Sequence, residues 1–325
     1  MKAIVFDQSV ALHHDYPMPT PGDGEALVKV RMAGVCNTDL EIMKGYMQFS
    51  GILGHEFVGV VSQVNGSDGG LLNRRVVGEI NCACGSCPLC KQGLYTHCSR
   101  RSVLGIAGKD GCFAEYLTLP ITNLHVVQDE IDDEAATFVE PLAAAFQIGE
   151  QVHLKPTDSI LVLGDGKLGL LITLALNLSP GIVCLAGNHP KKLAIAEAVG
   201  VETVPHPQLD AERKFDIVVD ATGSSAGFGK ALSHVRPRGT LVLKSTVADA
   251  AALNLAPLVI NEVTLVGSRC GPFRPAIDAL AKERVDVKPL IDHVFYPDAF
   301  SEALEKSRTK GTLKVLLDFR TESGC

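Results

Sequence analysis

Four cysteines crowd into one short stretch of this chain, with the spacing C-x2-C-x2-C-x7-C. They are Cys84, Cys87, Cys90 and Cys98. Four thiolates that meet around one ion form the closed tetrahedral ligand set of structural zinc. The alternative, four unrelated buried thiols, is disfavoured by the spacing. The pattern therefore predicts a lobe whose fold depends on a metal rather than on a large hydrophobic core.

The rest of the composition indicates a two-domain α/β protein. A chain of 325 residues exceeds the usual size of one domain, so we expect two cores and a ligand cleft between them. The apolar fraction of 46%, with 21% charged residues, excludes general disorder. A net charge of −7 argues against a nucleic-acid surface or an anionic membrane face as a partner.

The N-terminus does not have the pattern of a secretory signal. Residues 1–10 alternate apolar and polar side chains, without the basic, apolar and small-residue order of a signal peptide. No apolar run is long enough for a spanning helix. We therefore expect a cytoplasmic protein without a membrane partner, in which the 10 cysteines are metal ligands or small buried residues rather than disulfides.

The pattern of apolar runs changes along the chain. Up to about Leu119, short β-branched runs broken by Gly, Pro and Asn predict an antiparallel, barrel-like region. Later runs such as SILVLG, IVCLAG, FDIVVDAT and GTLVLKS alternate with helical stretches, which predicts a doubly wound parallel sheet. We place a first domain at residues 1–148, a dinucleotide-binding domain at 149–268, and a return to the first domain at 269–325.

A glycine loop lies at the start of this second pattern. Gly164, Gly166 and Gly169 form G-x-G-x-x-G between the strand SILVLG and a helix, with Lys167 and Leu168 inside the motif. The first two glycines allow a tight turn and close approach to a pyrophosphate, and the third allows the helix to pack on the strand. Because strand, loop and helix occur in this order, the segment predicts a dinucleotide site.

A second set of zinc-compatible residues is dispersed along the chain. Cys36 occurs in GVCNTDLE, His55 and Glu56 in ILGHEFVG, and Glu140 in FVEPLAA. Each alone is more typical of a buried packing residue than of a ligand. Together with the cysteine cluster and the glycine loop, they make the chain resemble the zinc-containing medium-chain alcohol and polyol dehydrogenases, and the resemblance runs through nearly all of the sequence.

The resemblance implies a barrel-like (GroES-like) catalytic domain, a Rossmann cofactor domain and two zinc ions per chain. It assigns the catalytic zinc to Cys36, His55 and Glu140, with Glu56 able to approach or replace a ligand. Glu rather than Cys at position 140 looks closer to the polyol and sugar dehydrogenase branch. The resemblance also implies that Thr38 takes the alcohol proton, and that the protein is a homo-oligomer, a dimer or a tetramer.

The chain departs from the family pattern beside Thr38. The family commonly has a His three residues further on, and this chain has Glu41. One interpretation is that Glu41 replaces the His as a carboxylate general base in the proton relay. The other is that Glu41 is an exposed side chain at the end of a strand. The sequence leaves both open.

The cofactor's ribose is expected at the end of the second parallel strand. NAD-specific sheets place an acidic residue there, and in this chain the position falls on Gly187. Without that acid a 2′-phosphate is not repelled, and Asn188, His189 and Lys192 follow as donors, so we expect NADP(H) to be favoured over NAD(H). Four further cofactor-site candidates follow later strands: Thr222, Gly223, Ser268 and Arg269. Arg269 is equally well explained as a surface ion-pair residue.

These features predict a zinc-dependent oxidoreductase. It would transfer a hydride between an alcohol, polyol or sugar hydroxyl, or the corresponding carbonyl, and NADP or NAD. The alternative is a regulatory protein of the same fold that binds zinc and nucleotide without catalysis. A nucleic-acid-binding zinc module is disfavoured, because the chain has no basic stripe.

Overall fold

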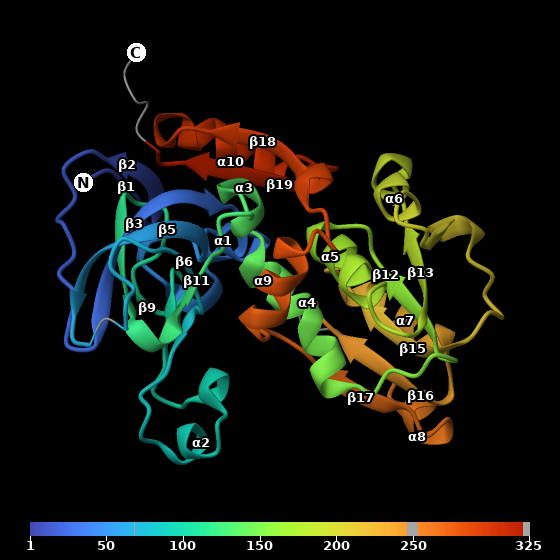
Figure 1. Ribbon diagram of the computed structural model, residues 1–325. Coiled ribbons are helices and arrows are strands. Elements are labelled where there is room, and N and C mark those ends of the chain that lie inside the picture. Colours follow the sequence, from blue (N-terminus) through green and yellow to red (C-terminus); the bar gives the residue numbers. More distant parts are fainter. Residues whose placement is uncertain (68, 246–252, 321–325) are drawn as a thin grey trace. The chain divides into compact units, whose positions relative to one another are not determined.

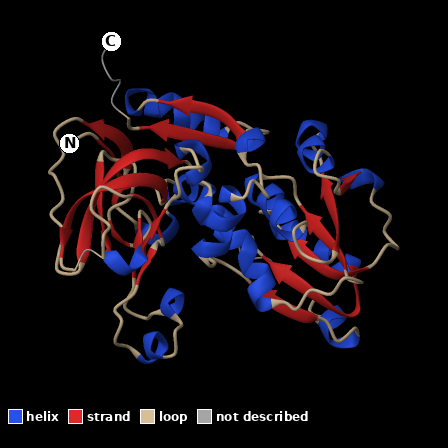
Figure 2. Ribbon diagram, viewed as in Figure 1, coloured by secondary structure: helices blue, strands red, loops and turns tan. Residues whose placement is uncertain are grey.

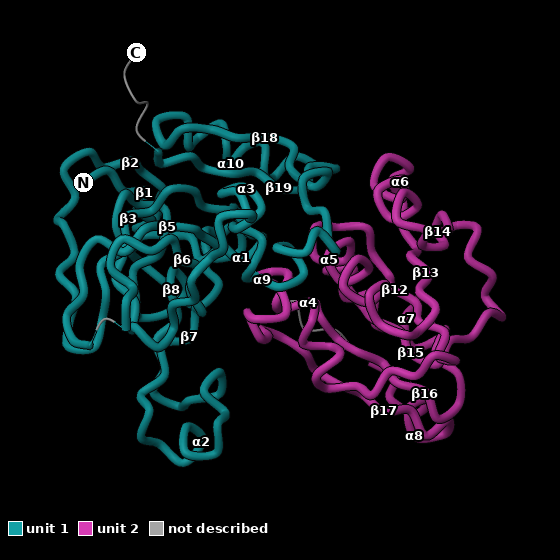
Figure 3. The backbone as a smooth tube through the Cα atoms, viewed as in Figure 1, with its two compact units in different colours: residues 1–140, 277–325 teal, residues 141–276 magenta. Residues whose placement is uncertain are grey.

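The computed structural model describes residues 1–67, 69–245 and 253–320, which form two compact units (Figure 3). One unit comprises Met1–Glu140 and Ile277–Cys325, and the other comprises Pro141–Ala276. The sequence placed these changes at 148/149 and 268/269. In the structure both changes fall inside helices, α4 (Val139–Gln151) and α9 (Phe273–Ala281). Because a helix continues through each change, the sequence pattern carries no break there.

The largest sheet of the first unit has seven strands (Figure 1). Their order is β11-β6-β5-β3-β19-β18, and β10 also pairs with β3. The strands are β3 (Glu25–Gly34), β5 (Glu56–Asn65), β6 (Arg75–Gly78), β10 (Tyr116–Pro120), β11 (Leu124–Val126), β18 (Ile291–Phe295) and β19 (Lys314–Asp318). All these pairings are antiparallel except that of β18 with β19.

The period-2 pattern explains why β3 lies inside this sheet. Val28, Val30 and Met32 are buried, whereas Lys29 is exposed and Arg31 is partly exposed. Alternate side chains of a strand point to opposite faces, so in the middle of β3 one face packs against the core and the other reaches water. This confirms the barrel-like antiparallel region expected from the first part of the sequence.

Two smaller sheets and four α-helices complete the first unit among the described residues (Figure 2). The sheets are β2-β1-β4 and β7-β8-β9, with strands β1 (Ala3–Asp7), β2 (Ser9–His13), β4 (Gly51–Ile52), β7 (Asn81–Cys82), β8 (Ser102–Leu104) and β9 (Gly108–Lys109). The helices are α1 (Asn37–Ile42), α2 (Pro88–Lys91), α3 (Asp133–Ala136) and α10 (Phe300–Arg308). No helix among the described residues of the chain is long and apolar enough to cross a membrane.

The second unit is a parallel sheet of six strands in the order β14-β13-β12-β15-β16-β17. The strands are β12 (Ser159–Leu163), β13 (Ile182–Gly187), β14 (Glu202–Pro205), β15 (Phe215–Asp220), β16 (Val235–Leu243) and β17 (Thr264–Gly267). The helices between them are α5 (Lys167–Leu176), α6 (Pro190–Glu197), α7 (Ser225–His234) and α8 (Ala256–Ile260).

Both faces of this sheet are buried. Leu161 and Leu163 of β12 pack in one cluster with Phe228 and Leu232 of α7. The residues between them, such as Val162, point to the opposite face, and Val162 is also fully buried. Burial on both faces is the property of a doubly wound sheet, which confirms the fold expected from the later apolar runs.

The strand register places the candidate cofactor residues that follow strands at one edge of this sheet. One continuous row of paired residues crosses five strands: Ala186, Leu163, Asp220, Leu243 and Gly267. Because the strands are parallel, the residues that follow this row all leave the sheet at its carboxyl edge. Ligands bind at this edge in open parallel sheets.

Candidate active site and metal centres

The glycine loop between β12 and α5 leaves room where a pyrophosphate would lie. Gly164 has φ +111°, and a Cβ on Gly169 would lie 1.9 Å from the Gly164 carbonyl oxygen. Neither position accepts a side chain without strain. At Gly166, which caps α5, a Cβ would meet nothing within 4 Å. Tight packing behind the loop and open space in front of the first helical turn, with Lys167 and Leu168, form a cradle that fits a phosphate group.

The ends of β15 and β17 lie at the same edge as this loop. Beyond β15, Thr222 donates to the buried Asp220 carboxylate through its backbone N–H (3.0 Å) and its hydroxyl (2.8 Å), and Gly223 N–H donates to Ser245 Oγ at 2.8 Å. Beyond β17, buried Ser268 receives a hydrogen bond from Lys244 Nζ at 3.3 Å, while Arg269 is exposed. The structure thus groups the strand-end residues that the sequence proposed.

The end of β13 contains an acid that sequence reasoning missed. Asp165, the second residue of the glycine motif, is buried, and its Oδ2 accepts backbone N–H groups of Asn188 and His189 at 2.7 Å each. His189 Nδ1 lies 3.0 Å from the same oxygen. Of the predicted donors, Asn188 is exposed and His189 partly exposed, whereas Lys192 is only 9% exposed. The acid was missed because the fingerprint accepts any residue at the second position of G-x-G.

The four clustered cysteines converge in a lobe around α2. Their sulfurs lie 3.5 Å (Cys87–Cys90), 3.5 Å (Cys98–Cys84), 3.7 Å (Cys87–Cys98) and 4.0 Å (Cys84–Cys90) apart. A tetrahedron with metal–sulfur bonds of about 2.3 Å separates its sulfurs by about 3.8 Å. The four sulfur positions therefore fit one zinc ion.

The surroundings of this lobe favour thiolates. The backbone N–H of Ser86 is the main cause that lowers the pKa of the Cys84 thiol, to about 5. The Arg100 guanidinium lies 3.3 Å from Cys84 Sγ and donates to Ser86 Oγ at 2.7 Å. A cation at this distance offsets part of the negative charge that four thiolates bring together. Sequence reasoning did not assign Arg100, whose two-residue offset from Cys98 carries no known signal.

The second group of ligand atoms is formed by strand pairing. Cys36 lies just past β3 and caps α1, and Glu56 starts β5, where it pairs with Gly34 of β3. This register brings ligand atoms of Cys36, His55 and Glu56 within 4.8 Å of one another. His55 and Glu56 are buried, and Cys36 is partly exposed. One thiol, one imidazole and one carboxylate form a mixed donor set that suits zinc.

A buried carboxylate orients this group. Asp39 of α1 is fully buried, and its Oδ2 accepts the Cys36 backbone N–H at 2.8 Å. Its Oδ1 accepts Gly54 N–H at 3.2 Å and lies 3.3 Å from His55 Nδ1. A carboxylate on one ring nitrogen leaves the other nitrogen, Nε2, for a metal and makes it a better ligand. Asp39 was missed because its role depends on a turn of α1 that sequence pattern does not place against His55.

The charges around His55 raise its pKa. Burial of the imidazole would lower its pKa, but the Asp39 carboxylate and the Cys36 sulfur outweigh burial and raise the pKa well above its usual value. Since a metal binds only the neutral imidazole, ion and proton compete for this side chain.

Glu56 is held by a buried lysine. Lys314, the first residue of β19, is 1% exposed and forms an ion pair with Glu56 Oε2. Its Nζ also lies 5.5 Å from the centre of the Phe138 ring. On the other side, a Cβ on Gly34 would come within 2.5 Å of Glu56 Oε2, so the carboxylate packs against a strand position without a side chain. Lys314 therefore fixes the carboxylate beside the ligand group.

The remaining candidates of the first unit lie around this group. Thr38 in α1 is partly exposed, and its Oγ1 lies 3.6 Å from Cys36 Sγ. Glu41 lies in the same helix rather than at a strand end, and its carboxylate forms an ion pair with exposed Lys44 at 2.8 Å. Glu140 lies in the first turn of α4 and is partly exposed. The ligand atoms found within 4.8 Å of one another belong to Cys36, His55 and Glu56, without Glu140.

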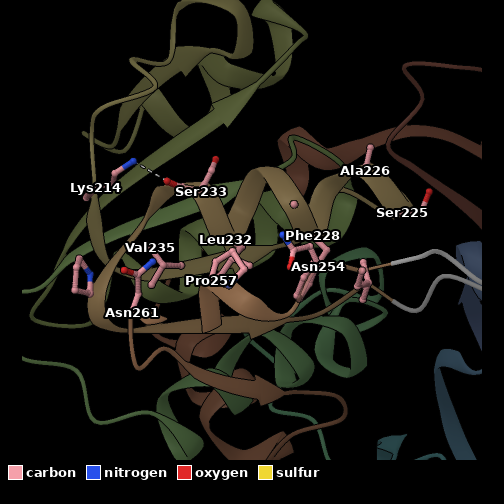
Figure 4. A pocket seen from close by; sticks show the side chains of 13 residues that line it. Lys214, Ser225, Ala226, Phe228, Leu232, Ser233, Val235, Asn254, Pro257 and Asn261 are labelled. Carbon is pink, nitrogen blue, oxygen red and sulfur yellow. Dashed lines mark hydrogen bonds between the residues drawn. The ribbon is translucent and has the colours of Figure 1, made fainter. Parts of the chain in front are cut away.

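A separate cavity of about 510 Å³ lies beside α7 in the second unit (Figure 4). Apolar side chains such as Phe228, Leu232 and Pro257 line it, and Lys214 Nζ donates to the Ser233 carbonyl oxygen at 2.8 Å. Its described lining contains no carboxylate, imidazole or thiol. Its described lining therefore offers no ligand set for a metal ion.

Comparison with known proteins relates both units to dehydrogenases. Residues 22–129 match the family described as "Alcohol dehydrogenase GroES-like domain", and residues 135–319 match the one described as "Glucose dehydrogenase C-terminus". Sorbitol dehydrogenase of Halalkalibacterium halodurans is 28% identical over 340 residues, covering 98% of this chain and 99% of that protein. L-threonine 3-dehydrogenase of Deinococcus radiodurans is 26% identical, covering 94% of this chain and 93% of that protein.

Solved structures agree with the fold over nearly the whole chain. A short chain alcohol dehydrogenase of Escherichia coli CFT073, complexed with NADH, superimposes with a TM-score of 0.90 at 26% identity, covering 98% of this chain and 99% of that one. A protein of Sinorhizobium meliloti described as a zinc-binding dehydrogenase, bound to NADP, gives 0.88 at 26% identity, with 98% of both chains covered. These matches confirm the predicted GroES-like and Rossmann folds.

Cys87→Ser should remove the zinc of the cysteine lobe. With one of the four sulfurs replaced, the tetrahedral set is incomplete, so we expect one zinc ion fewer per chain and a lower Tm. Zinc is measured by elemental analysis of the purified protein. Cys82→Ser is the matched control, since buried Cys82 lies near the lobe and is not in the ligand group. Equal zinc in Cys87→Ser and the wild type would contradict the assignment.

Lys314→Met should leave the buried Glu56 carboxylate without its cation. Breaking a buried ion pair from one side costs about 3–5 kcal/mol of unfolding free energy. Urea unfolding followed by circular dichroism measures the loss. Lys2→Met is the control, because Lys2 pairs with exposed Asp298 at the surface and should change stability little. The double change Lys314→Met with Glu56→Gln should recover part of the loss, and the same loss in both lysine variants would refute the role of burial.

Proposed function

The chain belongs to the zinc-containing medium-chain alcohol and polyol dehydrogenase family, and from that premise we propose that it oxidises a secondary hydroxyl of a polyol or sugar-derived alcohol. The observation that carries the proposal is the convergence of Cys36, His55 and Glu56 ligand atoms within 4.8 Å. A match to a sorbitol dehydrogenase over 98% of the chain supports the polyol class, as does an acidic residue, Glu140, in place of a Cys.

We assign the catalytic zinc to Cys36, His55 and Glu140, with Glu56 as a residue able to approach it. When bound, the ion polarises the alcohol oxygen and lowers the pKa of the hydroxyl. The chain's own residues prepare this chemistry. Asp39 holds His55 in one orientation at 3.3 Å, and Lys314 holds the Glu56 carboxylate to one side. Glu140, in the first turn of α4, would complete the set as its third protein ligand.

We assign the alcohol proton to Thr38. Its hydroxyl lies 3.6 Å from Cys36 Sγ and is partly exposed, so it can accept a proton next to the ligand group and pass it to water. Glu41 is engaged by Lys44 at the surface, and this pair supports the interpretation of Glu41 as an exposed side chain. The glycine loop and the strand ends at Thr222, Gly223, Ser268 and Arg269 would hold the dinucleotide.

The cysteine lobe has a structural role in this proposal. Four sulfurs close the coordination of a zinc ion, so no position is left for a substrate. Disulfides are rare in reducing compartments, so a cluster of four thiolates supports the proposed cytoplasmic setting.

We further propose that the protein is a homodimer or a larger homo-oligomer formed through the β17 edge of its parallel sheet. Among the described residues β17 pairs only with β16, and Leu265 on it is 43% exposed. Next to it in the chain, Val259 and Ile260 of α8 are 78% and 77% exposed. An exposed apolar edge strand promotes aggregation unless it is covered. We propose that a second copy of the chain covers it.

Dehydrogenase activity is tested with a panel of polyols, sugars and simple alcohols, and with the matching carbonyls, by the absorbance of the reduced nicotinamide. We expect turnover of at least one polyol. His55→Ala should lower kcat/KM by more than about a hundredfold, because the site loses several kcal/mol of charge stabilisation. It should also lose one zinc ion and still bind dinucleotide. No turnover of any alcohol by zinc-loaded wild type would favour the inactive, regulatory alternative.

Glu41→Gln should leave the pH profile of kcat unchanged, because Glu41 forms a surface ion pair with Lys44 and takes no part in the proton relay. Thr38→Ala should lower kcat, since it removes the proposed proton acceptor next to Cys36. Rates are measured across the pH range at saturating substrate. A profile shifted by Glu41→Gln would return Glu41 to the relay.

Val259→Glu should convert the oligomer into monomers, because a charge would be buried at the proposed interface. Sedimentation equilibrium measures the mass. Val199→Glu is the control, since Val199 is also exposed (44%) but lies in the turn after α6. A monomeric wild type would refute the proposal.

A further inference from the structure

A carboxylate lies at the end of β13 although no acidic residue occupies the strand end. The strand-end position is Gly187, whose lack of an acid led the sequence to predict NADP(H). The structure brings the Asp165 side chain to this place from the glycine loop on the neighbouring strand. The site at the end of β13 therefore contains an acid, although the acid does not belong to the strand.

The Asp165 side chain occupies the space that a side chain at position 187 would need. A Cβ placed on Gly187 would lie 2.6 Å from Asp165 Cβ and 2.6 Å from Asp165 Oδ2. Any side chain at position 187 would therefore collide with Asp165. The glycine is needed to admit the carboxylate, and the two residues together supply one acid to the site.

The two carboxylate oxygens of Asp165 accept different hydrogen bonds. Oδ2 accepts both backbone N–H groups, of Asn188 and His189 at 2.7 Å, and lies 3.0 Å from His189 Nδ1. Among the described residues, Oδ1 has one hydrogen-bond contact, the shared His189 Nδ1 at 3.1 Å. Oδ1 thus keeps the capacity to accept a further hydrogen bond, as from a ribose hydroxyl.

The same bonds remove the donors that a 2′-phosphate would use. The N–H groups after the second strand are already taken by Asp165, which remains negatively charged. Burial would raise its pKa, but hydrogen bonds from His189 and Asn188 outweigh burial and lower the pKa. Two of the basic side chains nearby offer little compensation. Burial and then the Lys230 ammonium lower the pKa of His206, which favours its neutral form, and Lys192 is only 9% exposed.

We propose that Asp165 replaces the strand-end acid of NAD-specific sheets: its Oδ1 accepts a hydrogen bond from the adenosine ribose 2′-hydroxyl, and its charge excludes a 2′-phosphate. The chain then selects NAD(H) over NADP(H), the reverse of the preference expected from Gly187 alone. The proposal rests on the dehydrogenase function proposed above. Similar chains are complexed with NADH in one case and NADP in another, so family membership does not decide the matter.

The test moves the acid from one position to the other. Dissociation constants of NADH and NADPH are measured by nicotinamide fluorescence without substrate, for the wild type, Asp165→Asn, Asp165→Gly and the double variant Asp165→Gly with Gly187→Asp. Glycine is required at position 165 in the double variant, because even the Cβ of an alanine would collide with a side chain at 187. The wild type should bind NADH at least tenfold more tightly than NADPH, about 1.4 kcal/mol.

Asp165→Asn and Asp165→Gly should reduce this ratio at least fivefold, and the double variant should restore it. Asp158→Asn is the matched control: Asp158 is also buried, and its carboxylate accepts Lys155 N–H at 2.8 Å, but it precedes β12 at the opposite end of the strand. Its ratio should equal that of the wild type. The Tm of each variant reports whether the loop is still folded.

Each other outcome overturns a defined statement. Preference for NADPH in the wild type, or a ratio unmoved by Asp165→Asn in a folded variant, overturns the role of Asp165 while the dehydrogenase function stands. Loss of the preference in both single variants without recovery in the double variant refutes the idea that the two positions supply one acid. Failure of the wild type to bind either dinucleotide overturns the dehydrogenase function itself, and this proposal with it.

Discussion

The pairing of three strands, β5 with β3 and β3 with β19, determines where the chemistry of this protein can occur. Gly34 pairs with Glu56 on one side and with Leu316 on the other. The first pair brings Cys36 and His55 together, since each lies beside it in the chain. The second brings Lys314 to Glu56 from 258 residues away in the sequence. A slip of one residue in either pairing would turn these side chains to the other face of the sheet.

Burying this group of charges costs folding free energy unless each charge has a partner of opposite sign or a hydrogen bond. Asp39, Glu56 and Lys314 are all nearly fully buried, and each unpaired charge would cost several kcal/mol. Asp39 accepts two backbone N–H groups and lies 3.3 Å from His55 Nδ1, and Glu56 pairs with Lys314. A metal cation bound by the Cys36 thiolate would add positive charge beside these carboxylates. The ligand group and its supporting residues therefore depend on one another, and removing a supporting residue should disturb both folding and metal binding.

Sequence reasoning found the residues whose spacing is local and missed those whose partners are distant. The cysteine lobe and the glycine loop are each encoded in one short segment, and strand-and-helix alternation is enough to predict the parallel sheet. Asp39 and Lys314 act on residues that the fold alone brings to them, whereas Arg100 lies close to the cysteine segment in the sequence but outside its motif. Asp165 is a different case, because it was visible inside G-D-G but only the packing against Gly187 shows where its side chain points. A sequence motif shows which residues a position can hold. Only the contact with Gly187 shows that Asp165 lies where other sheets have their strand-end acid.

The two metal groups also differ in charge, and the difference explains why one can be structural and the other catalytic. Four thiolates bring four negative charges to a divalent ion, so the ion's charge is more than neutralised and it polarises little else. The nearby Arg100, 3.3 Å from Cys84, compensates part of the excess from outside. A thiolate, a neutral imidazole and a carboxylate would only balance the charge of the ion, and three protein ligands would leave a coordination position open. Lys314 matters here because it offsets the Glu56 carboxylate, which would otherwise add another negative charge beside the ion. In the proposed function the buried lysine would therefore preserve the ability of the site to acidify a bound hydroxyl, an ability that a closed four-sulfur site would lack.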